Sequence, residues 1–265
     1  MSASFIRVGP TWRRRLALLI GLPAVAACGA REEGGSAPGA GTVDDYGAVI
    51  VTAAPARRIV SLNPTTTELL FALGAGERVV GRSRWDQWPA EALAVTEVGD
   101  AIRPSVERIM AARPDLVLLY ASGDNRAAAA ALAGAGIRVV ALRIDRIADL
   151  ERSLHIIGAL TGRDSAATLA IDSLRRSLDT VRAALRDVAR PRVFLHVWDN
   201  PLIAIGGGSY LSELVEIAGG RNVYGDLSGP SPQVSFEDLL RRDPDVILAG
   251  PGAAARLAAD ARWRA

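Results

Sequence analysis

The chain resembles itself on either side of one long helical pattern, and this internal repeat constrains the fold more than any other feature. The segments Val106 to Tyr120 and Phe236 to Gly250 align without a gap, and in each a short amphipathic stretch is followed by Pro-Asp and an apolar run. A second pair agrees, Thr67 to Gly81 with Ser212 to Gly225. Self-similarity of this kind indicates two copies of one structural unit. We therefore expect two similar lobes.

The stretch between the two copies, from about Ser165 to Ala189, has the pattern of one long helix. Its apolar residues recur at steps of three to five and are expected on one helical face: Leu169, Leu174, Leu178, Val181, Leu185 and Val188. Pro191 follows and stops the pattern. A helix of this length is roughly 37 Å long. We expect it to join the lobes as a stiff rod; a coiled-coil or bundle helix is the alternative.

Short apolar runs alternate with helical patterns on both sides of this stretch, which favours an α/β fold with mainly parallel sheets. We expect the first lobe over residues 56–163, the linking helix over 164–190 and the second lobe over 191–265. The second lobe looks one strand and one helix short of a closed design, so we expect the sequence to be truncated there. Strands are expected near Arg58 to Leu62, Arg78 to Gly81, Leu116 to Tyr120, Arg138 to Leu142, Val193 to Val197 and Val246 to Ala249.

The N-terminus has the pattern of an export signal. Residues 1–27 combine four arginines with a short apolar run, too short to remain as a membrane-spanning helix. Small residues precede Cys28, the only cysteine, as in a bacterial lipobox, whose cysteine is lipidated. An ordinary secretory signal with a chance cysteine is the alternative. Residues 28–55, rich in Gly and Ala at their start, are expected to form a flexible tether.

The charge of the chain argues against nucleic-acid binding. It has 31 basic and 29 acidic residues, and four of the arginines lie within residues 1–27. Without that segment acidic residues outnumber basic ones by two, so no basic excess remains to attract phosphates.

Aromatic residues follow the expected strands, and they are few in this chain. Because ligands of open parallel sheets bind beyond the carboxyl ends of the strands, aromatic side chains there can form flat stacking surfaces. Packing under loops is the alternative for each of them. Polar residues and prolines follow the same strands, although Thr65 can also cap a helix. The expected ligand-binding residues are Pro64, Thr65, Trp85, Trp88, Tyr120, Trp198, Asn200 and Tyr210.

Two glutamates, Glu107 and Glu237, occupy equivalent positions in the two repeats. Each stands in the first turn of an expected helix, where a carboxylate complements the helix dipole. The alternative is that one acid per lobe pairs with arginines of a partner protein.

Sequence signatures of catalysis are few. The chain has two histidines, His155 and His196, and no GxSxG or HExxH motif. With so few histidines and one cysteine, a site for a bare metal ion is not expected. A weak glycine-rich motif, Gly206 to Gly208, lacks the spacing of a phosphate-binding loop.

Three segments together resemble the periplasmic binding proteins of ABC importers for cobalamin, haem and ferric siderophores: RRIVSLNPTTTELLFALGAGERVVGRSRWDQWP, VERIMAARPDLVLLY and PQVSFEDLLRRDPDVILAG. The resemblance covers about Arg57 to Gly250. It implies two α/β lobes on a backbone helix and a ligand held between them. Cobalamin-binding members are the most similar, with an aromatic after the second strand, here Trp85, and one ending the next, here Tyr120. The resemblance also implies that Glu107 and Glu237 dock onto the permease.

These observations together predict a lipid-anchored, monomeric receptor of the periplasm that carries a corrinoid to an ABC permease and has no resident cofactor. A haem or ferric-siderophore receptor is the alternative, and an anionic siderophore would favour arginines in the cleft, with Arg82, Arg84 and Arg103 as candidates. A surface α/β hydrolase with a nucleophile paired to His196, or a scaffold lipoprotein without a ligand, are alternatives of other classes.

Overall fold

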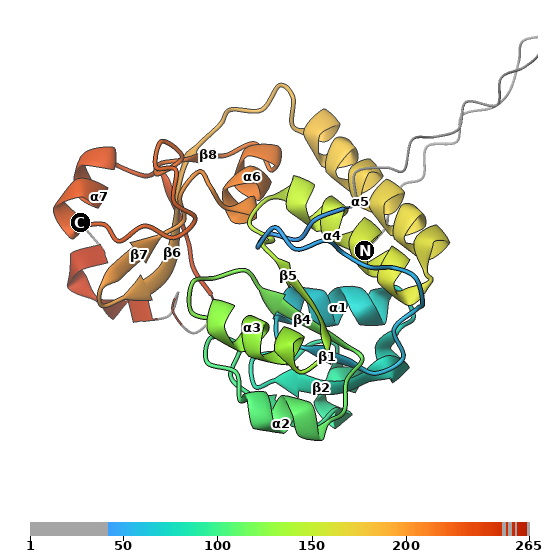
Figure 1. Cartoon of the computed structure of the whole chain (residues 1–265). Coiled ribbons are helices and arrows are strands. Elements are labelled where there is room, and N and C mark those ends of the chain that lie inside the picture. Colours follow the sequence, from blue (N-terminus) through green and yellow to red (C-terminus); the bar gives the residue numbers. More distant parts are fainter. Residues whose placement is uncertain (1–41, 251–252, 254–255, 258, 264–265) are drawn as a thin grey trace, which may run out of the picture. The chain divides into compact units, whose positions relative to one another are not determined.

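The computed structural model describes residues 42–250, 253, 256–257 and 259–263 of the chain. Its first sheet contains five parallel strands in the order β3-β2-β1-β4-β5 (Figure 1). The expected α/β fold with a mainly parallel sheet is confirmed. The sequence pattern predicted four of these strands and missed β3, whose three residues include only one large apolar side chain, Val98. The strands are β1 (Ile59–Ser61), β2 (Val79–Ser83), β3 (Glu97–Gly99), β4 (Leu116–Tyr120) and β5 (Arg138–Leu142).

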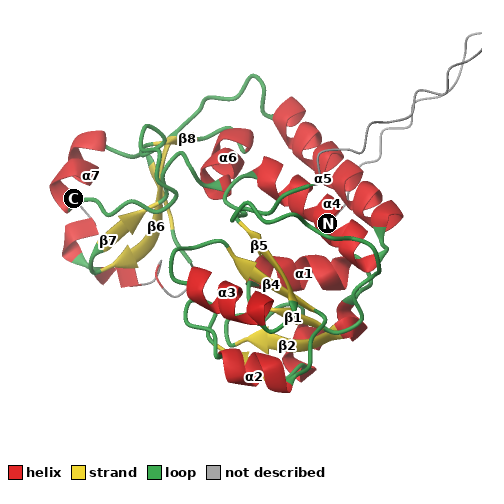
Figure 2. Ribbon diagram, viewed as in Figure 1, coloured by secondary structure: helices red, strands yellow, loops and turns green. Residues whose placement is uncertain are grey.

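Helices cover both faces of this sheet (Figure 2). One face packs against α1 (Pro64–Ala72), α4 (Ile147–Thr161) and the start of α5 (Asp164–Ala184), and the other packs against α2 (Val106–Ala111) and α3 (Arg126–Gly134). Burial on both faces explains why β4 reads as an unbroken apolar run rather than an alternating one. Two short 3-10 helices, η1 (Gly76–Arg78) and η2 (Ala90–Ala94), complete this lobe.

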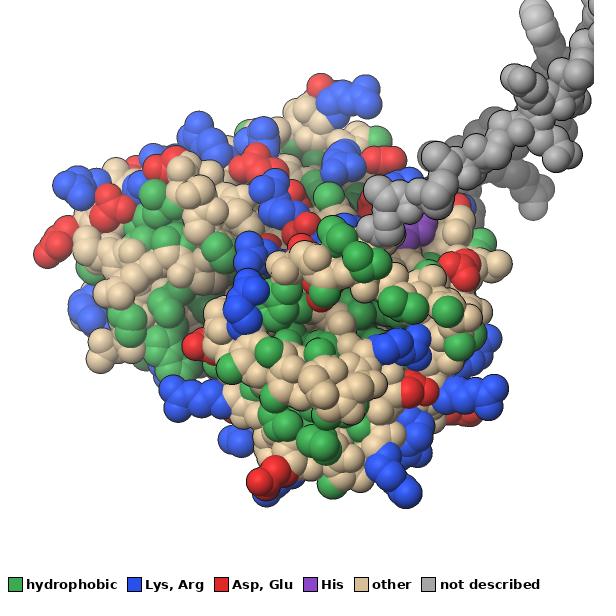
Figure 3. Space-filling view, viewed as in Figure 1, with side chains coloured by type: hydrophobic (Ala, Val, Ile, Leu, Met, Phe, Trp, Pro, Cys, Tyr) green, Lys and Arg blue, Asp and Glu red, His purple; other side chains and the backbone are tan. Residues whose placement is uncertain are grey.

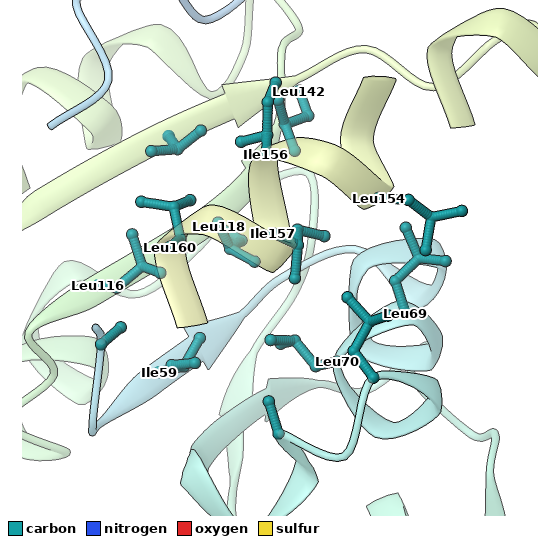
Figure 4. Close-up of a cluster of buried hydrophobic side chains, with 14 of the residues drawn as sticks. Ile59, Leu69, Leu70, Leu116, Leu118, Leu142, Leu154, Ile156, Ile157 and Leu160 are labelled. Atoms are coloured by element: carbon teal, nitrogen blue, oxygen red, sulfur yellow. The ribbon is translucent and has the colours of Figure 1, made fainter. Parts of the chain in front are cut away.

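The larger core lies between the sheet and α1 and α4 (Figure 4). Ile157 is fully buried at its centre, and Leu154 and Leu160 lie on the same side of α4. They meet Ile59 and Leu116 from the sheet. This packing gives the first lobe a rigid frame for the loops that leave its strands.

The linking helix α5 is present, but it is shorter than expected and has a different buried face. It ends at Ala184 rather than near Ala189, and a hydrogen-bonded turn follows. Its buried residues are Ala167 and Ile171, whereas Leu169 is 68% exposed. The expected face was wrong for Leu169, Val181 and Val188, all exposed, because the chain uses small residues where α5 crosses α4. Gly158 illustrates the close approach, since an added Cβ would lie 2.8 Å from that of Ala167.

The second sheet is smaller and mixed. Its central strand β6 (Arg192–Asp199) pairs in parallel with β8 (Arg221–Asn222) and β9 (Val246–Leu248), and antiparallel with β7 (Leu202–Ala204). Helices α6 (Tyr210–Ile217) and α7 (Phe236–Arg242) accompany it, and the 3-10 helix η3 (Ala261–Trp263) packs near Phe194. The sequence pattern missed β7 and β8, which have only three and two residues.

The internal repeat is confirmed in three dimensions. Ser105 caps α2 and Ser235 caps α7, and each helix leads through Pro-Asp into a strand parallel to the central one. The residue before each proline is left-handed, with φ of 48° at Arg113 and 43° at Asp243. Asp115 then accepts hydrogen bonds from the backbone N–H groups that precede β1. Asp245, the equivalent aspartate of the second copy, accepts a hydrogen bond from the backbone N–H of Arg192 at the start of β6.

Residues 42–55 pack against the first lobe and do not form the free tether expected over 28–55. Asp44 accepts hydrogen bonds from the backbone N–H groups of Tyr46, Ala48 and Ala141. Asp45 forms an ion pair with Arg152 at 2.5 Å. The aspartates therefore bind this segment to the edge of β5 and to α4, which composition could not predict.

The expected signal peptide over residues 1–27, the lipidation site Cys28 and residues 28–41 of the expected tether lie outside the described residues. Within the described part of the chain, no helix is both long and apolar enough to cross a membrane.

Candidate functional site

The polar residues after β1 divide between structural and exposed roles. Asn63, rather than a threonine, caps α1 by accepting a hydrogen bond from the N–H of Thr65 at 3.0 Å. The Thr66 hydroxyl lies 2.7 Å from that of Ser61, and both are buried. Pro64 and Thr65 stay half-buried at the end of the strand. The sequence predicted that Pro64 and Thr65 bind the ligand, and both remain accessible to solvent.

A buried carboxylate shapes the loop that carries Trp85. Asp86 is fully buried and accepts hydrogen bonds from Ser83 N–H at 3.0 Å, Ser83 Oγ at 2.7 Å and Thr67 Oγ1 at 2.8 Å. Burial raises the pKa of Asp86, and these hydrogen bonds oppose that shift. The sequence reasoning missed Asp86. Its position between two tryptophans in RSRWDQWP is the signal that could have indicated it.

The structure separates Trp85 and Trp88, which the sequence reasoning had grouped. Trp85 is 56% exposed and stands two residues after Ser83, the last residue of β2. Trp88 is 66% exposed and lies along the side of α1, in a groove that it lines together with Glu68, Leu69, Phe71, Ala72, Pro89 and Glu91. Only Trp85 therefore remains at the carboxyl edge of the sheet.

Tyr120 ends β4 and is half-buried. Its hydroxyl donates a hydrogen bond to Asp145 Oδ1 at 2.8 Å. Burial and this hydrogen bond raise the pKa of Tyr120 to about 12. Asn125, another buried residue that the sequence reasoning missed, donates from Nδ2 to the carbonyl oxygens of Tyr120 and Ala101, each at 3.0 Å. Asn125 thereby links two loops at the carboxyl edge of the first sheet.

The second sheet presents Trp198 near the end of β6. Trp198 is 61% exposed, and its Nε1 donates to the carbonyl oxygen of Asn200 at 3.1 Å. Asp199 Oδ1 lies 2.8 Å from Nε2 of the buried His196, and its Oδ2 accepts from Arg256 at 2.7 Å. Both partners hold the pKa of Asp199 below its ordinary value. The hydrogen bond to His196 and the ion pair with Arg256 anchor the strand end and leave the indole exposed.

The glycines Gly206 to Gly208 have a packing role. A Cβ added at Gly206 would lie 2.1 Å from the carbonyl oxygen of Gly229, and equally close approaches occur at Gly207 and Gly208. The backbone N–H groups of Gly206 and Gly207 also donate to the carbonyl oxygens of Pro230 and Leu227, so they are not available to a phosphate. The loop leads to Ser209, which caps α6, and to Tyr210, whose side chain is 42% exposed.

The exposed aromatic side chains thus come from both lobes. Trp85 and Tyr120 stand at strand ends of the first sheet, Trp198 at that of the second, and Tyr210 at the start of α6. The space-filling view shows hydrophobic side chains in the region of β6 and β7, with charged ones around them (Figure 3). Of the cleft arginines considered for an anionic ligand, Arg84 lies 3.5 Å from Asp100 and is partly neutralised by it.

Glu107 and Glu237 are exposed at the second residue of α2 and α7. No described residue forms an ion pair or hydrogen bond with either carboxylate. Their equivalent place in the repeat is consistent with a matched pair of contacts to one partner.

Among the described residues, no group of three or more histidine, cysteine or acidic side chains could hold a metal ion. The side chain of His196 is 1% exposed and packs against Phe194 and Trp263.

Comparison with known proteins gives consistent matches. A family model described as periplasmic binding protein matches residues 59–262. A vitamin B12-binding protein of Pectobacterium carotovorum subsp. carotovorum (strain PC1) is 31% identical over 208 residues, which are 77% of this chain and 75% of that protein.

Solved structures agree with this match. The periplasmic vitamin B12 binding protein BtuF of Vibrio cholerae is similar with a TM-score of 0.68 and 27% identity, covering 76% of this chain and 79% of that one. A periplasmic heme binding protein of Pseudomonas aeruginosa is similar with a TM-score of 0.69 and 25% identity, covering 76% of each chain. The fold, the repeat and these matches agree, and the chain belongs to the periplasmic binding protein family.

Proposed function

We propose that this protein is a lipid-anchored receptor that captures a corrinoid, most simply cobalamin, between its two lobes and delivers it to an ABC permease. The observation that carries the proposal is the set of exposed aromatic side chains contributed by both lobes, Trp85, Trp198 and Tyr210, together with the half-buried Tyr120. Large exposed aromatics on a soluble surface are favourable when a flat, partly apolar ligand covers them. The similarity to vitamin B12-binding proteins supports the same ligand class.

The proposed ligand surface comprises Pro64, Thr65, Trp85, Tyr120, Trp198, Asn200 and Tyr210. Trp88 is left out because it lines a separate groove along α1. No bond is made or broken in this function. The hydrolase alternative requires a nucleophilic side chain that is paired with His196. The His196 ring instead packs against aromatic side chains and hydrogen-bonds to Asp199.

Ligand identity is tested by visible absorption. The full chain is incubated separately with cyanocobalamin, haem and a ferric hydroxamate siderophore, and then passed through a desalting column. We expect the corrinoid spectrum to co-elute with the protein at one ligand per chain. Co-elution of haem instead would show that the ligand is haem rather than a corrinoid, the alternative suggested by the similarity to the heme binding protein of Pseudomonas aeruginosa. Elution without any of the three would contradict the receptor function.

The lipid anchor is proposed at Cys28, which follows small residues at the end of the expected signal segment. We expect Cys28→Ser to move the protein from the membrane fraction to the soluble periplasmic fraction when it is expressed in a Gram-negative host. An unchanged distribution would contradict lipidation at this residue. Sedimentation of the soluble form tests the proposed monomer.

A further inference from the structure

The two lobes contact each other where two helices begin. In the first lobe, the segment Asp145 to Ile147 leads into α4, and in the second lobe α6 begins at Tyr210. Glu213, one turn into α6, accepts from Arg146 Nε at 2.6 Å and from Arg146 Nη2 at 2.5 Å. Its other oxygen accepts from the backbone N–H of Ile147 at 2.7 Å. Glu213 of one lobe therefore caps a helix of the other.

The first lobe also supplies an acceptor to a helix of the second lobe. The backbone N–H of Tyr210, the first residue of α6, donates to the carbonyl oxygen of Asp145 at 2.5 Å. Asp149, in the first turn of α4, accepts from the backbone N–H of Asp145 at 3.1 Å and holds that loop in place. Six residues form this contact, which we call the inter-lobe contact: Asp145, Arg146, Ile147, Asp149, Tyr210 and Glu213.

Helix ends explain why this contact is favourable. The first N–H groups of a helix have no partner within it, and a carboxylate near them also complements the helix dipole. Here each helix obtains an acceptor for its first N–H group from the opposite lobe. The Glu213 side chain is 25% exposed and that of Arg146 is 49% exposed, so solvent screens the ion pair in part, and the backbone hydrogen bonds define the geometry of the contact.

Asp145 connects this contact to the proposed ligand surface. Its side chain accepts from the Tyr120 hydroxyl, and its carbonyl oxygen accepts from the N–H of Tyr210. One residue therefore binds an aromatic from each lobe, although Asp145 is not itself among the residues proposed to contact the ligand.

We propose that Asp145 and Glu213 are positioning residues, which hold the lobes in register and thereby set the places of Tyr120 and Tyr210 on the ligand surface. The inference rests on the proposed function for its effect on ligand binding. The contact between the lobes is tested independently of any ligand.

The first experiment measures hydrogen–deuterium exchange of backbone amides in the full chain. In Glu213→Ala we expect the amides of Ile147 and Tyr210 to exchange about tenfold faster. The Ile147 N–H loses its acceptor, the Glu213 carboxylate. The Tyr210 N–H keeps its acceptor, the carbonyl of Asp145, but the ion pair that holds that segment is lost. Glu216→Ala is the matched control, since that carboxylate contacts Arg190 and Asn222 but not the first lobe. Unchanged exchange at both amides in Glu213→Ala would overturn the proposal.

The second experiment separates positioning from general loss of structure. Asp145→Ala should weaken binding of the ligand found by absorption about tenfold, the loss typical of a hydrogen bond to a charged group. Asp145→Asn keeps an acceptor for the Tyr120 hydroxyl and should restore most of the affinity. In a Tyr120→Phe background, Asp145→Ala should have little further effect. Full additivity of the two substitutions, or no loss in Asp145→Ala, would contradict the positioning role.

A spectroscopic readout follows the same hydrogen bond without ligand. Tyrosinate absorption should show Tyr120 ionising at lower pH in Asp145→Ala than in the wild type, and the difference should vanish in Tyr120→Phe. If the wild-type chain binds none of the three ligands, the proposed function fails, while exchange and titration still decide whether the inter-lobe contact exists.

Discussion

Buried or half-buried polar residues fix the loops that carry Trp85 and Tyr120, and this is the main lesson at the scale of single residues. Asp86 accepts two hydrogen bonds from Ser83 and one from Thr67 of α1, Asp145 receives the hydroxyl of Tyr120, and Asn125 bonds to the backbone at Tyr120. An aromatic side chain left in solvent has no packing to fix it. Fixed neighbours reduce the entropy that binding a ligand would otherwise remove.

Replacing single tryptophans tests which of them stack on the ligand. We expect Trp85→Ala and Trp198→Ala each to weaken corrinoid binding by roughly 1–3 kcal/mol, because each removes a flat apolar surface. Trp88→Ala is the matched control: it removes an equally exposed indole from the groove along α1 and should leave affinity unchanged. Calorimetric titration measures all three. Equal losses in all three variants would refute the separation of Trp85 from Trp88.

Tyr120 should make stability depend on pH in the alkaline range. Its pKa is about 12 in the folded protein against an ordinary value of 10.0, so the folded state keeps a proton that the unfolded state loses. The stabilisation is complete below about pH 10, and the free energy of unfolding should fall as the pH rises toward about 12. Urea unfolding across this window measures the decline. Tyr120→Phe should show a shallower one, and an identical slope would exclude Tyr120 as its source.

At the scale of elements, one unit of structure occurs twice, and its strand is buried in the first copy but exposed in the second. The unit of helix, Pro-Asp and strand recurs with its serine cap, its left-handed residue and its strand-binding aspartate. Its strand is fully buried in β4 apart from Tyr120, but β9 is exposed at all three residues. The neighbouring strand β5 makes the difference, since it covers β4 and the described part of the second lobe shows no counterpart.

The buried face of α5 can be tested with a matched pair of substitutions. Ile171→Ala should lower the free energy of unfolding by about 2–4 kcal/mol, because Ile171 is 2% exposed in the large core. Leu169→Ala, on the exposed side of the same helix, should change it by less than about 0.5 kcal/mol. Chemical denaturation gives both values. The reverse ranking would restore the helical face that the apolar spacing alone had suggested.

At the scale of the whole molecule, the proposed function requires a surface for the permease as well as one for the ligand. Glu107 and Glu237 are exposed at equivalent points of the repeat and form no ion pair with the described residues. Two acids related by the repeat suit a partner with two-fold symmetry, because each can meet the same arginine arrangement.

Charge reversal tests this docking surface. We expect the double variant Glu107→Arg, Glu237→Arg to abolish ligand uptake by cells that carry the cognate permease, while affinity in solution stays unchanged. Glu97→Arg, at another exposed glutamate of the first lobe, is the control and should transport normally. Reduced ligand affinity in the double variant would mean that the two acids belong to the ligand surface instead.

Rigid coupling of the lobes leads to a last expectation. Helix α5 and the inter-lobe contact leave few torsions free to absorb a domain rotation, so free and ligand-bound forms should differ by only small lobe movements. Small-angle scattering with and without ligand measures this. A large compaction on binding would show that the lobes close by a hinge.

The sequence by itself determined the parts of this protein that follow from local spacing. Apolar periodicity predicted the alternating helices and strands, β4 and β5 to the residue, and alignment of the chain with itself predicted the two related halves. Strand ends followed from these, so Trp85, Tyr120 and Trp198 could be expected at the sheet edges. Such features depend on neighbours within a few residues, which the sequence displays directly.

Only the tertiary structure decided how these parts meet. The docking of residues 42–55 on β5, the buried face of α5, the separation of Trp88 from Trp85 and the hydrogen bonds of Asp86, Asn125 and Asp145 all involve partners distant in the chain or in another element. Polar side chains carry no periodic signal, and whether one is buried depends on donors and acceptors that folding brings together. For that reason the residues that position the site emerged from the structure, whereas those proposed to contact the ligand could be named beforehand.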